Sequence, residues 1–112
     1  MFYPNNYIAV IGAGSWGTTL ANLLSNKGYD VTLWVYEADL AAEINEKRTN
    51  HLYLPGIILS ENLIATNDLK KAVINSRYIL NVVPTQHIRS VFEEIKDMIS
   101  DEAVIINASK GI

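Results

Sequence analysis

The stretch that decides the fold is Tyr7 to Gly28, YIAVIGAGSWGTTLANLLSNKG, in which three glycines lie within six positions. Gly12, Gly14 and Gly17 have the spacing G-x-G-x-x-G and come directly after an apolar run. In that context the first glycine allows a tight turn, the second lets backbone approach a pyrophosphate, and the third lets the helix close on the sheet. The stretch therefore predicts a dinucleotide-binding turn between a strand and a helix.

The start of this helix suits an anion. Its first N–H groups have no partner within the helix, and the helix dipole leaves that end partly positive. The alternative is a tight turn that happens to contain glycines, but here the strand, the spacing and the helix occur together.

Short apolar runs alternate with helical patterns along the whole chain. Runs typical of parallel strands covered on both faces occupy residues 7–11, 31–35, 63–66, 78–83 and 103–107. Helices are expected after Gly14, from Glu37 to about Arg48, after Asn67 as N-cap, and after Thr85. This alternation implies right-handed crossovers. We therefore expect an α/β fold, a Rossmann-type doubly wound parallel sheet in three α/β/α layers, with strand order 3-2-1-4-5.

The helical patterns also predict buried faces. The first helix is expected to turn inward Trp16, Leu20, Leu23 and Leu24, and to end at Gly28. The last is expected to bury Ile88, Val91, Phe92, Ile95 and Ile99. Residues 49–61 form the one long connection, and long connections are often functional.

The composition excludes several function classes. The chain has 112 residues, of which 49% are hydrophobic, and this suits one compact domain. A net charge of −3 offers no basic surface for nucleic acid, and the absence of Cys excludes disulfides and thiolate metal sites. The apolar stretch at residues 8–14 is far shorter than the roughly 18 residues of a membrane span. We expect a soluble cytoplasmic protein with no metal site, no nucleic-acid partner and no membrane span.

The end of the second strand offers two further candidates. Glu37 stands about 20 positions after the glycines, where a carboxylate accepts hydrogen bonds from the adenosine ribose. It could equally be a first-turn carboxylate that favours the helix dipole. Tyr36 offers a flat face to adenine or ribose, or packs as a strand-end aromatic.

Five motifs carry a resemblance to a known family: GAGSWGTTLA, LWVYE, HLYLPG, VVPTQHIRSV and INASKGI. In this order they resemble the N-terminal cofactor domain of NAD(P)-dependent glycerol-3-phosphate dehydrogenase, and they cover nearly the whole chain. The resemblance implies reversible hydride transfer between sn-glycerol 3-phosphate and dihydroxyacetone phosphate, which feeds phospholipid synthesis. It implies NAD or NADP as cofactor and small-molecule partners, with a homodimer as the candidate assembly of the whole protein.

The resemblance also assigns residues. With the motif glycines Gly12, Gly14 and Gly17 and with Glu37, it implies cofactor contacts at Ser15, Trp16, Tyr36, Tyr53, Val83, Pro84 and Lys110. Ser15 and Trp16 would meet the phosphates and Val83 and Pro84 the nicotinamide side. Lys110 would touch both cofactor and substrate. No catalytic residue is expected within the chain, because the family's acid/base lysine would lie beyond residue 112.

Each assignment has a plainer alternative. Trp16 could belong to the core, Tyr53 could anchor its loop, and Lys110 could be a solvated loop cation.

Cofactor choice is expected to lean towards NAD. Tyr36 and Glu37 offer no basic group to a 2′-phosphate, although Lys47 or Arg48 could swing towards the ribose. We expect residues 1–112 to be one cofactor domain, cut before a helical substrate domain and inactive alone. The alternatives are a non-catalytic dinucleotide-sensing module, or another two-domain hydroxyacid or hydroxyacyl-CoA dehydrogenase.

Overall fold

The computed structural model describes residues 7–74, 76–83 and 88–108. In them, strands and helices alternate as the sequence predicts. The strands are β1 (Tyr7–Ile11), β2 (Asp30–Trp34), β3 (Leu63–Thr66), β4 (Tyr78–Asn81) and β5 (Val104–Asn107). The helices are α1 (Ser15–Asn26), α2 (Ala38–Lys47), α3 (Leu69–Val73) and α4 (Ile88–Ile95). All neighbouring strands pair in parallel in the order β3-β2-β1-β4-β5, which confirms the predicted fold class and strand order.

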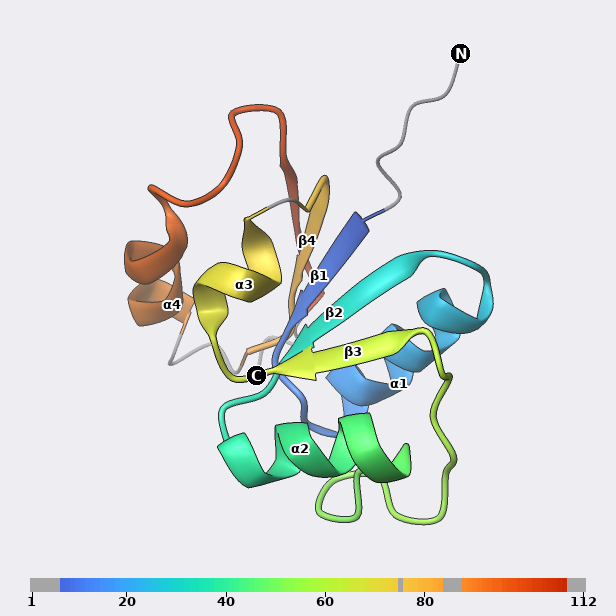
Figure 1. The fold of residues 1–112 in the computed structure, drawn as a ribbon. Helices are drawn as coiled ribbons and strands as arrows, with labels where there is room; N and C mark the ends of the chain where they lie inside the picture. Colours follow the sequence, from blue (N-terminus) through green and yellow to red (C-terminus); the bar gives the residue numbers. More distant parts are fainter. Residues whose placement is uncertain (1–6, 75, 84–87, 109–112) are drawn as a thin grey trace.

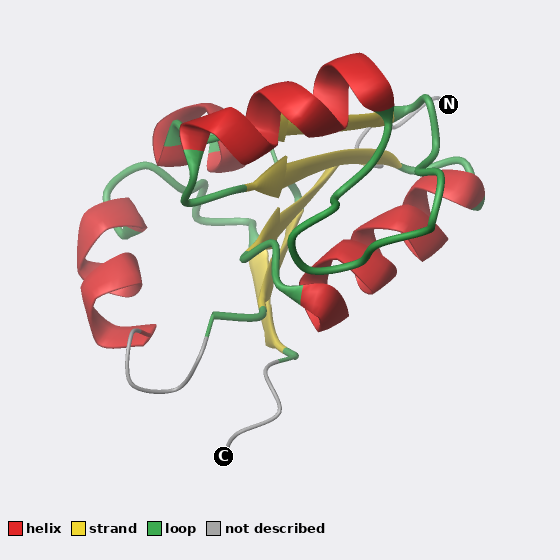
Figure 2. Ribbon diagram, turned by 90° about the horizontal axis from the view of Figure 1, so that it is seen from below, coloured by secondary structure: helices red, strands yellow, loops and turns green. Residues whose placement is uncertain are grey.

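The helices form one layer on each face of the sheet. α1 and α2 pack against one face and α3 and α4 against the other (Figure 1). β1 lies between β2 and β4, so the strand order reverses at β1, and in open α/β sheets ligands bind at the carboxyl ends of the strands at such a point. The long connection, residues 48–62, passes between α2 and α1 (Figure 2).

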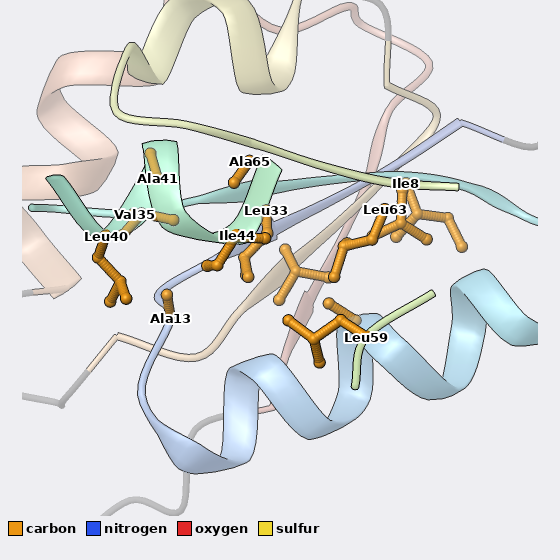
Figure 3. Close-up of a cluster of buried hydrophobic side chains, with 13 residues drawn as sticks. Ile8, Ala13, Leu33, Val35, Leu40, Ala41, Ile44, Leu59, Leu63 and Ala65 are labelled. Atoms are coloured by element: carbon orange, nitrogen blue, oxygen red, sulfur yellow. The ribbon is translucent and has the colours of Figure 1, made fainter. Parts of the chain in front are cut away.

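The core beneath α1 and α2 is built from alternate strand residues. Leu33 of β2 and Leu63 of β3 are fully buried beneath Leu40 and Ile44 of α2. Figure 3 shows Ile44 of α2 pointing towards Leu33 and Leu63, with Leu40 further along the helix and Leu59 of the long connection beside α1. In β1, Ile8 and Val10 belong to this core. Neighbouring strand residues point to opposite faces, so Ala9 and Ile11 belong instead to the core under α3 and α4.

The apolar face predicted for α1 is partly wrong: Leu20 and Leu24 are half-buried and Leu24 packs against the core, but Trp16 and Leu23 do not. Trp16 and Leu23 are 41% and 51% exposed, and the buried positions of the helix are Gly17, Thr18, Ala21 and Ser25. Small side chains on this face let the helix approach the turn and the sheet closely. The predicted end of the helix is confirmed: Gly28 has φ +102°, and its N–H donates to the Ser25 carbonyl.

Three other local expectations need correction. α2 begins at Ala38, with Glu37 as its N-cap. The N-cap of α3 is Asp68 rather than Asn67, and its carboxylate accepts from the N–H groups of Lys70 and Lys71. β5 is exposed along its length and not covered on both faces. Among the described helices, none is long and apolar enough to cross a membrane.

Candidate functional site

The glycine-rich turn lies at the carboxyl edge of the sheet, where the strand order reverses. The Gly12 N–H donates to the Trp34 carbonyl at the end of β2 over 3.2 Å. On the other side, the Val82 N–H donates to the Ile11 carbonyl over 3.0 Å. The turn therefore lies between the ends of β2 and β4, and α1 starts directly after it. In an open α/β sheet, ligands bind at this point.

Two of the three motif glycines are required by the fold. Gly12 has φ +120°, and a Cβ there would lie 3.2 Å from the carbonyl carbon of Val82. A Cβ on Gly17 would lie 1.9 Å from the Gly12 carbonyl oxygen, which no side chain tolerates. These are the roles expected for them, a tight turn and a close approach of the helix.

Gly14 is different, because nothing in the fold requires it to be glycine. It is the N-cap of α1 with φ −67° and ψ −174°, a conformation open to any residue. A Cβ on Gly14 would have no atom within 4 Å. The space above this residue is open, and the first turn of α1 carries no acidic side chain that would repel an anion. A bare backbone here fits the close approach of a ligand.

Beneath the turn lies a buried polar network that sequence reasoning missed. The Ala13 carbonyl accepts from Thr18 Oγ1 at 3.0 Å and from Asn50 Nδ2 at 3.1 Å. Asn50 Nδ2 also donates to Thr18 Oγ1 at 2.9 Å. Thr18 and Asn50 are both fully buried. No pattern in the sequence marks Asn50, because it stands in a polar loop without periodicity.

Glu37 and Tyr53, predicted on separate grounds, lie together. The Tyr53 hydroxyl donates to Glu37 Oε2 over 2.6 Å, and this hydrogen bond to a carboxylate raises the pKa of Tyr53. Glu37 makes no side-chain hydrogen bond to the start of α2, so its carboxylate is engaged by Tyr53 instead. The pair lies beyond the carboxyl end of β2, one strand away from the glycine turn.

The loop that carries Tyr53 is tied to α2 by Glu43. Its carboxylate accepts from Thr49 Oγ1 at 2.7 Å, from the His51 N–H at 2.9 Å, and contacts the His51 ring nitrogen Nδ1. The Thr49 hydroxyl is the largest influence, and with His51 it lowers the pKa of Glu43 to about 2. Besides the Tyr53–Glu37 hydrogen bond, the loop is therefore attached to α2 through Glu43 and to the glycine turn through Asn50.

Arg48 lies at the amino end of β3, whereas Glu37 follows the carboxyl end of β2. Its Nη1 donates to the Ser60 carbonyl at 2.9 Å and to the carbonyl of Leu63, the first residue of β3. The idea that Arg48 swings towards the ribose finds no support in this arrangement.

Trp16 crosses the carboxyl edge to the other half of the sheet. Its indole Nε1 donates to the Ala108 carbonyl, just after β5, over 2.8 Å. With 41% exposure it is not a core residue. Tyr36 is 79% exposed at the end of β2, and its ring meets Trp34 edge-on at 6.2 Å.

The remaining candidates divide by position. Ser15, exposed, opens α1, and Val83 is buried next to the turn. Pro84 and Lys110 lie outside the described residues. The structure thus brings Gly12, Gly14, Ser15, Trp16, Gly17, Tyr36, Glu37, Tyr53 and Val83 to one edge of the sheet.

Comparison with known proteins shows which family the chain belongs to. The family model described as NAD-dependent glycerol-3-phosphate dehydrogenase N-terminus matches residues 7–112. The chain belongs to this family. Membership confirms the predicted resemblance, and a family of NAD-dependent enzymes agrees with the expected cofactor, NAD or NADP.

Curated relatives carry the corresponding name. The chain is 53% identical over 105 residues to the glycerol-3-phosphate dehydrogenase (NAD(P)+) of Citrifermentans bemidjiense, and 50% identical to that of Geobacter sulfurreducens. Each match covers 94% of this chain and 31% of the relative. The chain thus spans about a third of the length of the curated relatives it matches.

Solved structures of this family share the fold. The glycerol-3-phosphate dehydrogenase of Coxiella burnetii superposes with a TM-score of 0.88 at 39% identity, over 96% of this chain and 33% of that one. The enzyme from Saccharomyces cerevisiae also reaches 0.88, at 33% identity, over 97% of this chain and 34% of its own.

Proposed function

We propose that this chain binds a nicotinamide dinucleotide across the carboxyl edge of its sheet. The pyrophosphate would lie at the glycine turn against the start of α1, and the adenosine beside Tyr36, Glu37 and Tyr53. The observation that carries the proposal is the open Cβ position of Gly14. At Gly12 and Gly17, by contrast, the fold itself requires glycine. Such a gap beside a helix N-terminus fits a phosphate group.

We propose further that the whole protein is a glycerol-3-phosphate dehydrogenase. The bound nicotinamide would supply the hydride acceptor or donor for the reversible reaction between sn-glycerol 3-phosphate and dihydroxyacetone phosphate. Lys110 would donate a hydrogen bond to the substrate oxygen, with the acid/base lysine beyond residue 112. Residues 1–112 would form its cofactor domain, inactive alone, in a cytoplasmic homodimer that feeds phospholipid synthesis. Family membership supports this reading over a sensing module or a hydroxyacid or hydroxyacyl-CoA dehydrogenase.

The test of dinucleotide binding is Gly14→Val, studied by calorimetry with NADH. We expect NADH binding to be lost, because the new side chain fills the space of the pyrophosphate, while circular dichroism stays close to wild type. Ala42→Val, on the exposed face of α2, is the control and should bind normally. Unchanged affinity in Gly14→Val would exclude the pyrophosphate position.

Cofactor choice tests the adenosine end. Because a carboxylate accepts hydrogen bonds from ribose hydroxyls and repels a 2′-phosphate, we expect NADH to bind at least as tightly as NADPH. Glu37→Gln should reduce any difference in affinity between NADH and NADPH. Titration of both cofactors against both proteins measures it, and a clear preference of the wild type for NADPH would show that Glu37 does not face the ribose.

A further inference from the structure

Asn50 uses its whole side-chain amide inside the protein. Nδ2 donates to the Ala13 carbonyl and to Thr18 Oγ1, and Oδ1 accepts from the Tyr53 N–H at 3.0 Å. Its backbone carbonyl accepts from the Leu54 N–H at 2.9 Å. One fully buried residue therefore joins the glycine turn, α1 and the loop of Tyr53.

The peptide that Asn50 holds is the one that presents Gly14. Ala13 C=O and Gly14 N–H belong to the same planar trans peptide, in which the two groups point in opposite directions. The carbonyl is held inward by two fully buried side chains, Thr18 and Asn50. The Gly14 N–H must therefore point the opposite way, away from Thr18 and Asn50.

We propose that Asn50 is a positioning residue for the dinucleotide. It orients the Gly14 N–H towards the pyrophosphate and fixes the position of the Tyr53 loop relative to the glycine turn. This inference rests on the proposed function. Without the hydrogen bond from Asn50, the peptide at residues 13–14 keeps only that from Thr18 and is freer to rotate. A preorganised donor is worth more than one that must be ordered when the ligand binds.

The chemistry of the amide explains why an asparagine serves here. The Ala13 carbonyl and the Thr18 hydroxyl need a donor, and the Tyr53 N–H needs an acceptor, so the site requires both on one short, neutral side chain. An aspartate has the same shape, but when ionised it has no proton to donate to the Ala13 carbonyl. It would also place a buried negative charge beneath a phosphate site, and burial would raise its pKa.

The test is therefore Asn50→Asp, with NADH affinity measured by calorimetry across pH in the full-length protein. At about pH 8.5 we expect binding at least about tenfold weaker than wild type, since the carboxylate repels both the Ala13 carbonyl and the ligand. At about pH 5.5 the protonated acid donates again, and affinity should return to within about threefold. His51 and Glu43, the titratable pair beside Asn50, are present in both proteins, so the wild-type profile corrects for them.

Asn45→Asp is the control at an exposed asparagine. Asn45 also uses both ends of its amide, at 2.8 Å from the N–H and the carbonyl of Ala65, but it joins α2 to β3 away from the turn. It should cost stability without a pH-dependent change in NADH affinity. If Asn50→Asp does not fold, Thr18→Val and Thr18→Ser replace it, with weaker binding expected for Val and wild-type binding for Ser, which keeps the hydroxyl.

The outcomes separate the two proposals. If the wild type binds no NADH, the proposed function fails. If the wild type binds and Asn50→Asp binds NADH as tightly as wild type at every pH, or more weakly by the same factor at every pH, the positioning role is overturned and the proposed function stands.

Discussion

Two buried asparagines mark the two halves of the carboxyl edge, and their surroundings differ. Asn50, beneath the turn on the β1–β2 side, has partners for both ends of its amide. Asn81, at the end of β4, is 3% exposed; its Oδ1 accepts from the Val83 N–H at 3.3 Å, and its Nδ2 has no partner among the described residues. A buried donor without a partner destabilises a fold, so the second half is less completely assembled within these residues.

The edge strands show the same contrast. β3 buries Leu63 and Ala65 beneath α2, whereas β5 leaves Val104, Ile105 and Ile106 at least 40% exposed. The hydrogen bond from Trp16 to the Ala108 carbonyl connects the start of α1 with the end of β5. Among the described residues, the adenosine half of the proposed site therefore has Glu37, Asn50 and Tyr53 paired, while β5, on the nicotinamide half, leaves apolar side chains exposed. The predictions below test this difference.

The largest effect is expected where the two halves meet, at Gly17. Gly17→Ala places a Cβ against the Gly12 carbonyl, with Val82 of the β4 side also in contact, and should destabilise the protein by about 3 kcal/mol or more. Gly14→Ala is the comparison within the same motif. It should change stability by less than about 1 kcal/mol, because the restriction of the unfolded chain offsets the weaker preference of Ala for the N-cap and no clash is added. Urea unfolding measures both, and equal losses would contradict the division of roles among the glycines.

Lys110 tests the nicotinamide half in the full-length protein. Lys110→Ala should lower kcat/KM for glycerol 3-phosphate by about 100-fold, because a hydrogen bond to the reacting oxygen can contribute about 3 kcal/mol in the transition state. NADH affinity should change less than kcat/KM. Full activity in the variant, or turnover by residues 1–112 alone, would contradict the proposed division of labour.

The asparagines themselves provide a direct comparison of stability. Asn50→Leu should cost about 2 kcal/mol, since it leaves the Tyr53 N–H unpaired and removes a bond from the Ala13 carbonyl. Asn81→Leu should change stability by less than about 1 kcal/mol, because the loss of a long hydrogen bond is offset by the removal of an unpartnered donor. Thermal unfolding measures the loss of stability in both variants. A larger loss at Asn81 would show that its amide has a partner in the folded protein.

The smallest effect is a pH dependence of the Tyr53 loop. The pKa of Glu43 is lowered from 4.5 to about 2, so the unfolded chain binds more protons in that interval and stability from this carboxylate falls as pH drops from about 4.5 to 2. Glu43→Gln should therefore have a lower Tm than wild type above about pH 5, and the difference should shrink towards pH 2. Calorimetric scans across this range measure the difference, and a constant gap would exclude the ionised carboxylate as the cause.

Local chemistry and chain connectivity made much of this predictable. Gly12 and Gly17 follow from a turn and a close contact that their spacing specifies, and the open position of Gly14 agrees with the same motif. The parallel sheet followed from the alternation of strands and helices with right-handed crossovers, and the strand order from the dinucleotide-binding fold that the glycine motif indicates. The places of Glu37 and Tyr36 followed from their distance after the motif.

What the sequence by itself determined is the strand–turn–helix unit, the parallel sheet and the residues that end its strands, because periodicity and glycine geometry act over a few neighbours. Only the tertiary structure decided which face of α1 is buried, since the close approach at Gly17 favours Thr18 and Ala21 over Leu23. It alone paired Tyr53 with Glu37, 16 positions apart, and Asn50 with Ala13, 37 positions apart. Such hydrogen bonds depend on where the long connection crosses the sheet, and no local pattern encodes that position.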